Sequence, residues 1–177
     1  MHTWQMDAWT LSAGLLIARL AIGLLMAAHG AQKLFGWFGG PGLRRFGEVL
    51  AQMGYRPGLA FASAAAVGEF ASGLLIALGF LGPIGPALML SVMIVAMITV
   101  HWSHGVFAMK NGIEVPLLYA VASIVFAVVG YGAYSLDALL GAANPWPAPL
   151  AWGALAVGLL GGLANSAIRR PPQEKEA

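Results

Sequence analysis

The sequence places a few ionisable side chains inside long apolar stretches, where each of them needs a reason. Arg19 and Glu69 lie deep within apolar runs, and the stretch AAHGAQKLFGWFGG at 27–40 carries His29 and Lys33 four residues apart. An ionisable group within a bilayer costs at least about 2.5–3.5 kcal/mol on insertion scales. These residues are therefore the first candidates for a functional site.

Arg19 and Glu69 are predicted to lie at similar depths in the membrane, close enough to form an ion pair. In one interpretation the pair only neutralises two charges and fixes the helix register. In the other, both side chains line a polar cleft in which Glu69 carries protons. Ala65 and Gly73 flank Glu69 at four residues on either side, and such a small-residue face is typical of contact with protein rather than lipid.

More polar side chains gather toward one end of the apolar runs. Histidine titrates near neutral pH, so this group suits proton exchange with a reducible carbonyl. Simpler roles compete with that hypothesis. Lys33 can extend to the lipid headgroups, His29 can be a buried histidine with satisfied hydrogen bonds, and Glu114 with Asn111 fits a helix capping box. The members of the group are His29, Lys33, His101, His104 and Glu114.

A line of methionines offers a second chemistry. Met89, Met93, Met97 and His101 follow one another at four-residue spacing, and thioether sulfur with imidazole suits Cu(I). Methionine also packs well in apolar cores, which is the commoner reason for such a line. No metal is favoured, and the weak candidates for ligands are Met93, Met97, His101 and His104.

The composition identifies the class of protein. Of the 177 residues, 59% are hydrophobic and 9% are charged, whereas an ordinary soluble domain carries about 25% charged residues. Several apolar runs reach the roughly 20 residues that a bilayer span requires. The sequence therefore predicts an all-α, polytopic membrane helical bundle, because in lipid every backbone polar group must be satisfied within the helix.

Other features of the sequence exclude some chemistry. The chain has no cysteine, so disulfides, thiol relays and iron–sulfur ligation are excluded. The first ten residues hold no Lys or Arg, which predicts no cleaved signal peptide. The basic residues behind the pI of about 9.2 lie at the predicted membrane borders, so they reflect topology and not nucleic-acid binding.

Length and turn residues predict five spans in a single membrane domain over 1–177. The fifth of them is a C-terminal transmembrane helix. Residues 41–56 have the apolar spacing of a short helix in the membrane interface, and 169–177 form a polar tail. The predicted spans cover 11–36, 58–80, 83–105, 114–131 and 149–168.

Charge asymmetry predicts the orientation of these spans. Eight of the nine Lys and Arg residues, all except Arg19, fall on one side of a five-span topology, which places the N-terminus outside and the C-terminus in the cytoplasm. Small residues at four-residue spacing in the last span, Gly158 and Gly162 among them, favour close packing within the chain or with a second copy. The basic residues on the cytoplasmic side are Lys33, Arg44, Arg45, Arg56, Lys110, Arg169, Arg170 and Lys175.

These residues together resemble a known family. The order of Arg19, the H-G-x-Q-K-x-F-G run at 29–36, Glu69 with Gly73, the histidine ending the third span, GIE at 112–114 and GYGAYSLD at 130–137 resembles the DoxX family of bacterial membrane proteins. The resemblance implies a four-helix core in the bacterial inner membrane. It also implies a link to membrane redox or oxidative-stress complexes, one of which is a thiosulfate:quinone oxidoreductase. The family's polar positions correspond to Arg19, His29, Lys33, Glu69, His101 and Glu114.

The leading hypothesis is a membrane subunit that offers a quinone and proton site to a partner oxidoreductase. An apolar cleft with a few hydrogen-bond donors and a proton path would suit a quinone headgroup. The sequence has no motif for flavin, haem or iron–sulfur, so the chain would take electrons from a partner redox protein or transfer none, and it is not predicted to be an enzyme alone. His29 or His101 would hydrogen-bond a carbonyl, Lys33 or Arg19 would stabilise a reduced anion, and Glu69 or Glu114 would exchange protons.

Two alternatives come from other functional classes. A transporter or copper-handling protein would use the methionine line and the Arg19–Glu69 pair. A membrane anchor would recruit a soluble enzyme through the basic loop around Arg44, Arg45 and Arg56.

Overall fold

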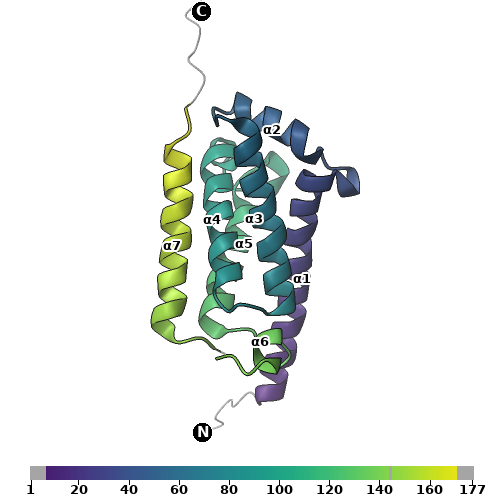
Figure 1. The fold of residues 1–177 in the computed structure, drawn as a ribbon, viewed down its shortest axis with the longest axis vertical. Coiled ribbons are helices and arrows are strands. Elements are labelled where there is room, and N and C mark those ends of the chain that lie inside the picture. Colours follow the sequence, from purple (N-terminus) through teal and green to yellow (C-terminus); the bar gives the residue numbers. More distant parts are fainter. Residues whose placement is uncertain (1–6, 144, 171–177) are drawn as a thin grey trace, which may run out of the picture.

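The computed structural model describes residues 7–143 and 145–170. Seven α-helices lie in this part of the chain, and five of them, α1, α3, α4, α5 and α7, run alongside one another (Figure 1). Helix α2 lies across one end of the bundle, and α6 lies at the other end. The predicted all-α membrane helical bundle is confirmed. The helices are α1 (Ala8–Phe35), α2 (Gly42–Gln52), α3 (Gly58–Leu78), α4 (Ile84–Ala96), α5 (Glu114–Val129), α6 (Leu136–Leu139) and α7 (Ala148–Ala167).

The helices differ from the predicted spans by a few residues at their ends, and α4 differs in kind. The regular α-helix ends at Ala96. The chain continues in the same direction as a π-helical segment, Met97–His101, and then as a 3₁₀ turn, Trp102–His104. Of the described helices, α1, α3, α7 and the continuous Ile84–His104 are long and apolar enough to cross a membrane. Helix α5 has 16 residues because Gly130 ends it, so the five-span count remains a prediction. Residues 171–177 of the predicted tail, with Lys175, and residues 1–6 lie outside the described residues.

Local sequence fixes where the bundle helices begin and end. The Asp7 carboxylate caps α1 by accepting a hydrogen bond from the backbone N–H of Thr10, at 2.6 Å. Gly36 ends α1 and Gly79 ends α3, both in the left-handed conformation, with φ of 73° and 65°. Glycine adopts this conformation without steric cost, which explains the abrupt ends of both helices.

Glycines bring α1 and α3 close together. A Cβ atom on Gly23 would lie 2.6 Å from the backbone oxygen of Gly73 and from the backbone nitrogen of Ala77. Only glycine fits such a backbone contact. Gly73 therefore faces α1, as the small-residue face beside Glu69 predicts, and Glu69 is 3% exposed.

The small-residue face of α7 packs inside the chain. A Cβ on Gly162 would lie 2.7 Å from the backbone oxygen of Ser91, and Gly158 meets the backbone of Ala87, also in α4. The face predicted to serve either a neighbouring helix or a second copy is thus covered by α4. Contact between copies through Gly158 and Gly162 would require α7 to leave its place.

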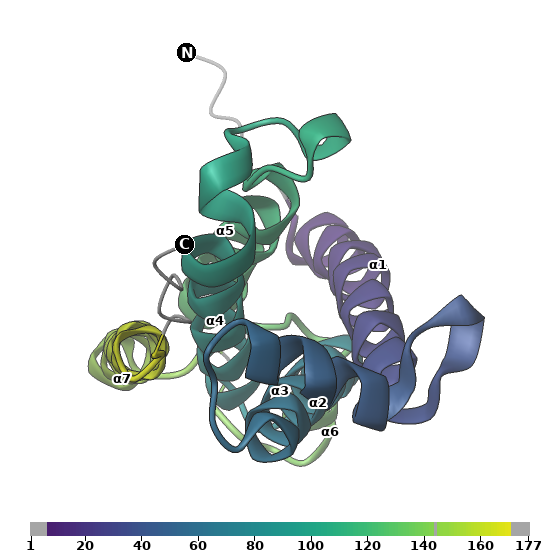
Figure 2. The same ribbon diagram turned by 90° about the horizontal axis from the view of Figure 1, so that it is seen from above.

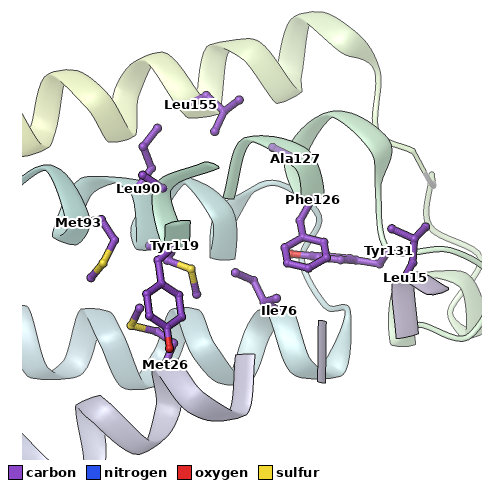
Figure 3. Close-up of a cluster of buried hydrophobic side chains, with 12 residues drawn as sticks. Leu15, Met26, Ile76, Leu90, Met93, Tyr119, Phe126, Ala127, Tyr131 and Leu155 are labelled. Atoms are coloured by element: carbon purple, nitrogen blue, oxygen red, sulfur yellow. The ribbon is translucent and has the colours of Figure 1, made fainter. Parts of the chain in front are cut away.

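The apolar core of the bundle and helix α2 surround the candidate site. Met26, Ile76, Met93 and Tyr119 belong to one cluster of buried side chains between α1, α3, α4 and α5 (Figure 3). Seen from above, α2 crosses the ends of α3 and α4 (Figure 2). Leu50 of α2 is buried, whereas Arg44 and Arg45 are exposed, as predicted for an amphipathic helix in the interface.

Candidate functional site

The central feature is an ion pair between Lys33 and Glu69. Lys33 lies two residues before the end of α1, and Glu69 lies near the middle of α3, yet Nζ of Lys33 donates directly to Oε1 of Glu69. A helical side chain leans toward the N-terminus of its own helix, so Lys33 reaches back into the bundle and not out to the headgroups. The side chains are 27% and 4% exposed, respectively.

Each partner of this pair retains unused hydrogen-bonding capacity. Oε2 of Glu69 is buried and has no hydrogen-bond partner among the described residues. The ammonium of Lys33 carries three protons, and it also lies 5.2 Å from the centre of the Phe46 ring of α2, within the range of a cation–π contact. The pair is therefore able to engage another polar group.

The predicted Arg19–Glu69 ion pair is wrong. Arg19 is 2% exposed, but its guanidinium donates to the backbone oxygens of Ala77 and Tyr134. It thereby joins the end of α3 to the segment before α6, about four turns along α1 from Lys33. Depth in the membrane alone suggested the pair, whereas Lys33 reaches Glu69 because its stem is long and flexible.

Arg19 belongs to a polar cluster at the opposite end of the bundle from α2. Asp137 of α6 accepts hydrogen bonds from the backbone N–H groups of Leu81, at 2.9 Å, and Gly82, at 2.7 Å. The Tyr131 hydroxyl donates to the backbone oxygen of Gly82 at 2.7 Å. These bonds hold the turn between α3 and α4, so we assign Arg19 a structural role.

A large cavity opens on one side of the ion pair. It has a volume of about 480 Å³ and lies between α2, α3 and α4, with Asn165 of α7 at its edge. Its walls are mostly apolar, and its charged or ionisable side chains are Lys33, Glu69, His101 and Tyr55. The apolar lining includes Phe46, Leu50, Phe61, Leu88, Val92 and Val95.

A smaller cavity of about 110 Å³ opens on the other side of the pair. It lies between α1, α4 and α5 and is lined by His29 and Tyr119 in addition to Lys33, Glu69 and His101. The rings of His29 and Tyr119 meet edge to face, with centroids 6.1 Å apart. His29 is exposed, so the alternative in which it is a buried histidine with satisfied hydrogen bonds is wrong.

The π-helical segment places His101 beside both cavities. Its Nδ1 lies 2.7 Å from the backbone oxygen of Asn111, and because a carbonyl can only accept, Nδ1 carries the proton. Nε2 of the neutral ring is then the atom left to accept or take up a proton. Single π turns within α-helices occur frequently at functional sites.

The structure separates His104 and Glu114 from this group. His104 is exposed, and its Nδ1 lies 2.9 Å from the backbone oxygen of Val100. Oε2 of Glu114 accepts from the backbone N–H of Ala108 at 2.7 Å and so closes the loop before α5. The predicted capping box with Asn111 is not formed, because Glu114 is already the first residue of α5 and its carboxylate turns back to that loop.

The weak metal candidates are also divided. Met93 and His101 line the smaller cavity, whereas His104 lies outside it at the exposed end of the α4 extension. In the described parts of the chain, no three His, Asp or Glu side chains are placed to hold a metal ion. Met89 and Met93 are buried in the apolar core, with exposures of 0% and 5%, where methionine packs well.

Three side chains that matter here were not selected from the sequence. Phe46 faces Lys33, Tyr119 lies between Met26 and Met93 in the core (Figure 3), and Asp137 holds the α3–α4 turn. Tyr119 and Asp137 had a usable signal, since a phenol within an apolar span and a lone carboxylate beside one both require partners. Phe46 had none, because its contact depends on how α2 folds back over the bundle.

Comparison with known proteins identifies a family with a similar sequence. The DoxX family model matches residues 14–102, about half of the chain. The matched segment contains both partners of the ion pair and His101, and it ends within the extension of α4. No curated protein and no solved structure matches the chain.

Proposed function

The chain belongs to the DoxX family of membrane proteins, and from that premise we propose that its larger cavity binds the headgroup of a membrane quinone for a partner redox system. The observation that carries the proposal is the buried Lys33–Glu69 pair at the end of an apolar cavity, with one carboxylate oxygen left without a partner. A volume of about 480 Å³ lies within the range of roughly 300–1,000 Å³ typical of small-molecule sites.

The chemistry of the lining suits a flat ring with two oxygen substituents. Apolar walls would hold the ring, and the mouth includes the exposed residues Val49 and Ala64, which face the surroundings of the bundle. Lys33 would donate a hydrogen bond to a carbonyl oxygen and stabilise negative charge on it. Glu69 would accept a hydrogen bond from a hydroxyl group through Oε2.

Proton exchange would fall to the side chains around the pair. Reduction of a quinone to a quinol consumes two electrons and two protons, and we assign the electrons to a partner redox protein. His101 would exchange a proton at Nε2, since Nδ1 is held by Asn111. Arg19 and Glu114, which the family resemblance also suggested, lie elsewhere and take no part.

The distribution of basic residues supports a proposal for the orientation of the protein in its membrane. The described basic residues, apart from Arg19, occur on α2, on the loops beside it and at the ends of α1, α4 and α7 nearest to it. We propose that this end of the bundle faces the cytoplasm of a bacterial inner membrane, following the positive-inside rule.

Quinone content tests the proposed site. The protein would be purified in mild detergent with lipids of its host membrane, and its quinone measured by solvent extraction and chromatography. Ala65→Phe fills part of the larger cavity, and Ala21→Phe, an exposed position on α1 outside it, is the matched control. We expect near-stoichiometric quinone in the wild type and in Ala21→Phe, and at least a tenfold loss in Ala65→Phe. Absence of quinone from the wild type, or its retention in Ala65→Phe, would overturn the proposal.

A second candidate, a membrane anchor for a soluble enzyme, is favoured by the exposed basic side chains beside α2. Arg44, Arg45 and Arg56 are all exposed at this end. In this function, replacing the three arginines by glutamate abolishes recruitment of the partner, while Glu69→Gln leaves recruitment intact. In the quinone function, Glu69→Gln lowers the quinone content, whereas replacing the three arginines leaves it unchanged.

A further inference from the structure

The Lys33–Glu69 pair belongs to both cavities. Of the residues that line the larger and the smaller cavity, four are shared, namely Lys33, Glu69, Ala96 and His101. The pair therefore forms part of the wall between them, and Glu69 can be approached from two sides.

The two sides offer different environments. The larger cavity is walled mainly by apolar side chains of α2, α3 and α4. The smaller cavity adds His29 and Tyr119 to the shared polar residues, and it reaches the surface at His29, which is exposed. At about 30 Å³ per water, its 110 Å³ have room for roughly three waters, and its polar lining supplies the partners that buried water requires.

We propose that the smaller cavity is the proton route to Glu69, separate from the larger cavity that admits the apolar ligand. A proton leaves the His29 imidazolium, passes along water in the cavity and binds Oε2 of Glu69, which leaves His29 neutral to take the next proton from solvent. Lys33 keeps its own proton and holds Oε1. The destination of the proton, the ligand in the larger cavity, rests on the proposed function; the route to Glu69 does not.

Several elements packed around Glu69 carry titratable groups, among them Tyr55 before α3, which lines the larger cavity. Helix α1 contributes His29 and Lys33, the π-helical segment contributes His101, and α5 contributes Tyr119. His29 combines exposure at the mouth with an imidazole ring that can both bind and release a proton. Glu114, at the start of α5, is turned toward the backbone of Ala108.

Access of water to the smaller cavity can be measured directly because the native chain has no cysteine. Val115 lines the smaller cavity and is 43% exposed, and Leu117, one turn or less away on the same helix, is equally exposed at 43% but lines neither cavity. We expect Val115→Cys to react with a small, charged methanethiosulfonate at least tenfold faster than Leu117→Cys. Equal, slow reaction at both positions would show a dry cavity and overturn the proposal. Neither substitution adds bulk, so folding is not at risk.

The proton itself is followed by infrared spectroscopy. At a pH where Glu69 is protonated, its carboxyl stretching band is identified by the absence of that band in Glu69→Gln. After transfer into D₂O, the band shifts as deuterium replaces the carboxyl hydrogen. We expect exchange to slow at least tenfold in Val115→Phe, which narrows the cavity, and less than twofold in the control Leu117→Phe. Unchanged exchange in Val115→Phe, or slowing in Ala65→Phe instead, would overturn the route. If Val115→Phe binds quinone as the wild type does, slower exchange in this variant reports the proton route and not a loss of the quinone site. If neither the wild type nor any variant binds quinone, only the proposed quinone function is overturned.

Discussion

Removing Lys33 should destabilise the protein more than removing Glu69, although the two side chains form one ion pair. In Lys33→Met, Glu69 stays fixed on α3 with a side chain that is 4% exposed, and its Oε2 already lacks a partner among the described residues. Breaking a buried pair in this way costs about 3–5 kcal/mol. In Glu69→Gln, Lys33 sits near the end of α1 and can turn outward to the headgroups, so the loss is about 1.5 kcal/mol, that of a hydrogen bond to a charged group.

The assay is equilibrium unfolding of the protein in detergent micelles by increasing fractions of dodecyl sulfate, followed by helicity. The double variant Lys33→Met/Glu69→Gln leaves no buried charge, so it should be close to Glu69→Gln in stability. The coupling free energy from the double-mutant cycle should then be about 3–5 kcal/mol, which is the cost of leaving Glu69 charged and buried without Lys33.

The exposed pair Arg44–Glu48 is the matched control. Nε of Arg44 lies 3.8 Å from Oε1 of Glu48, with both side chains mostly exposed. Arg44→Met should change stability by no more than about 0.5 kcal/mol. Equal costs for Lys33→Met and Glu69→Gln, or additive effects in the double variant, would refute the reasoning that Glu69 is the trapped partner.

Three further outcomes are expected in the same unfolding assay. Asp137→Ala should lower stability by about 2–3 kcal/mol, because it removes two hydrogen bonds from backbone N–H groups to a charged acceptor in the α3–α4 turn; a loss below 0.5 kcal/mol would show that the turn holds without it. Gly158→Leu should displace α7 from α4 and lower stability, whereas Gly153→Leu, where a Cβ meets open space, should not; similar losses would contradict the packing. The bond from the Thr10 N–H lowers the pKa of Asp7 below its ordinary value of 3.8, so its contribution to stability is present above that value and disappears as the pH falls through the lower, folded value. The stability difference between the wild type and Asp7→Ala should therefore be constant above pH 5 and shrink below pH 4, and a difference that grew in acid would contradict this sign.

The class of fold and most helix positions follow from simple physics of the sequence. Long apolar runs separated by glycine and proline turns are enough to locate the bundle helices, because in lipid each span must satisfy its own backbone. The change at Ala96 from α-helix to π-helix was not predictable in this way. A π turn adds one residue to a helix without altering its apolar composition, so hydropathy does not register it.

The partner of each buried charge was harder to predict. Arg19 and Glu69 lie at comparable depths, yet their side chains are satisfied by different partners at different levels of the bundle. Depth along a helix is read from the sequence, but the rotation of each helix and the direction of each side chain come from packing. The backbone oxygens that accept from Arg19 have no signal in the sequence, since every residue carries one.

The position of Glu69, which is buried, and of Lys33, which is half-buried, argues for a function of the pair. A buried ion pair is often no more stable than apolar side chains of the same size, because the desolvation of both charges offsets their attraction. If the pair served only to hold α1 against α3, glycine contacts such as that between Gly23 and Gly73 would already suffice. The charges lie instead where two cavities meet, with an oxygen of Glu69 left unpaired. On this reasoning Lys33→Met/Glu69→Leu, with both charges replaced by apolar side chains, should be at least as stable as the wild type and yet bind no quinone. A double variant that lost several kcal/mol would assign the pair to the fold.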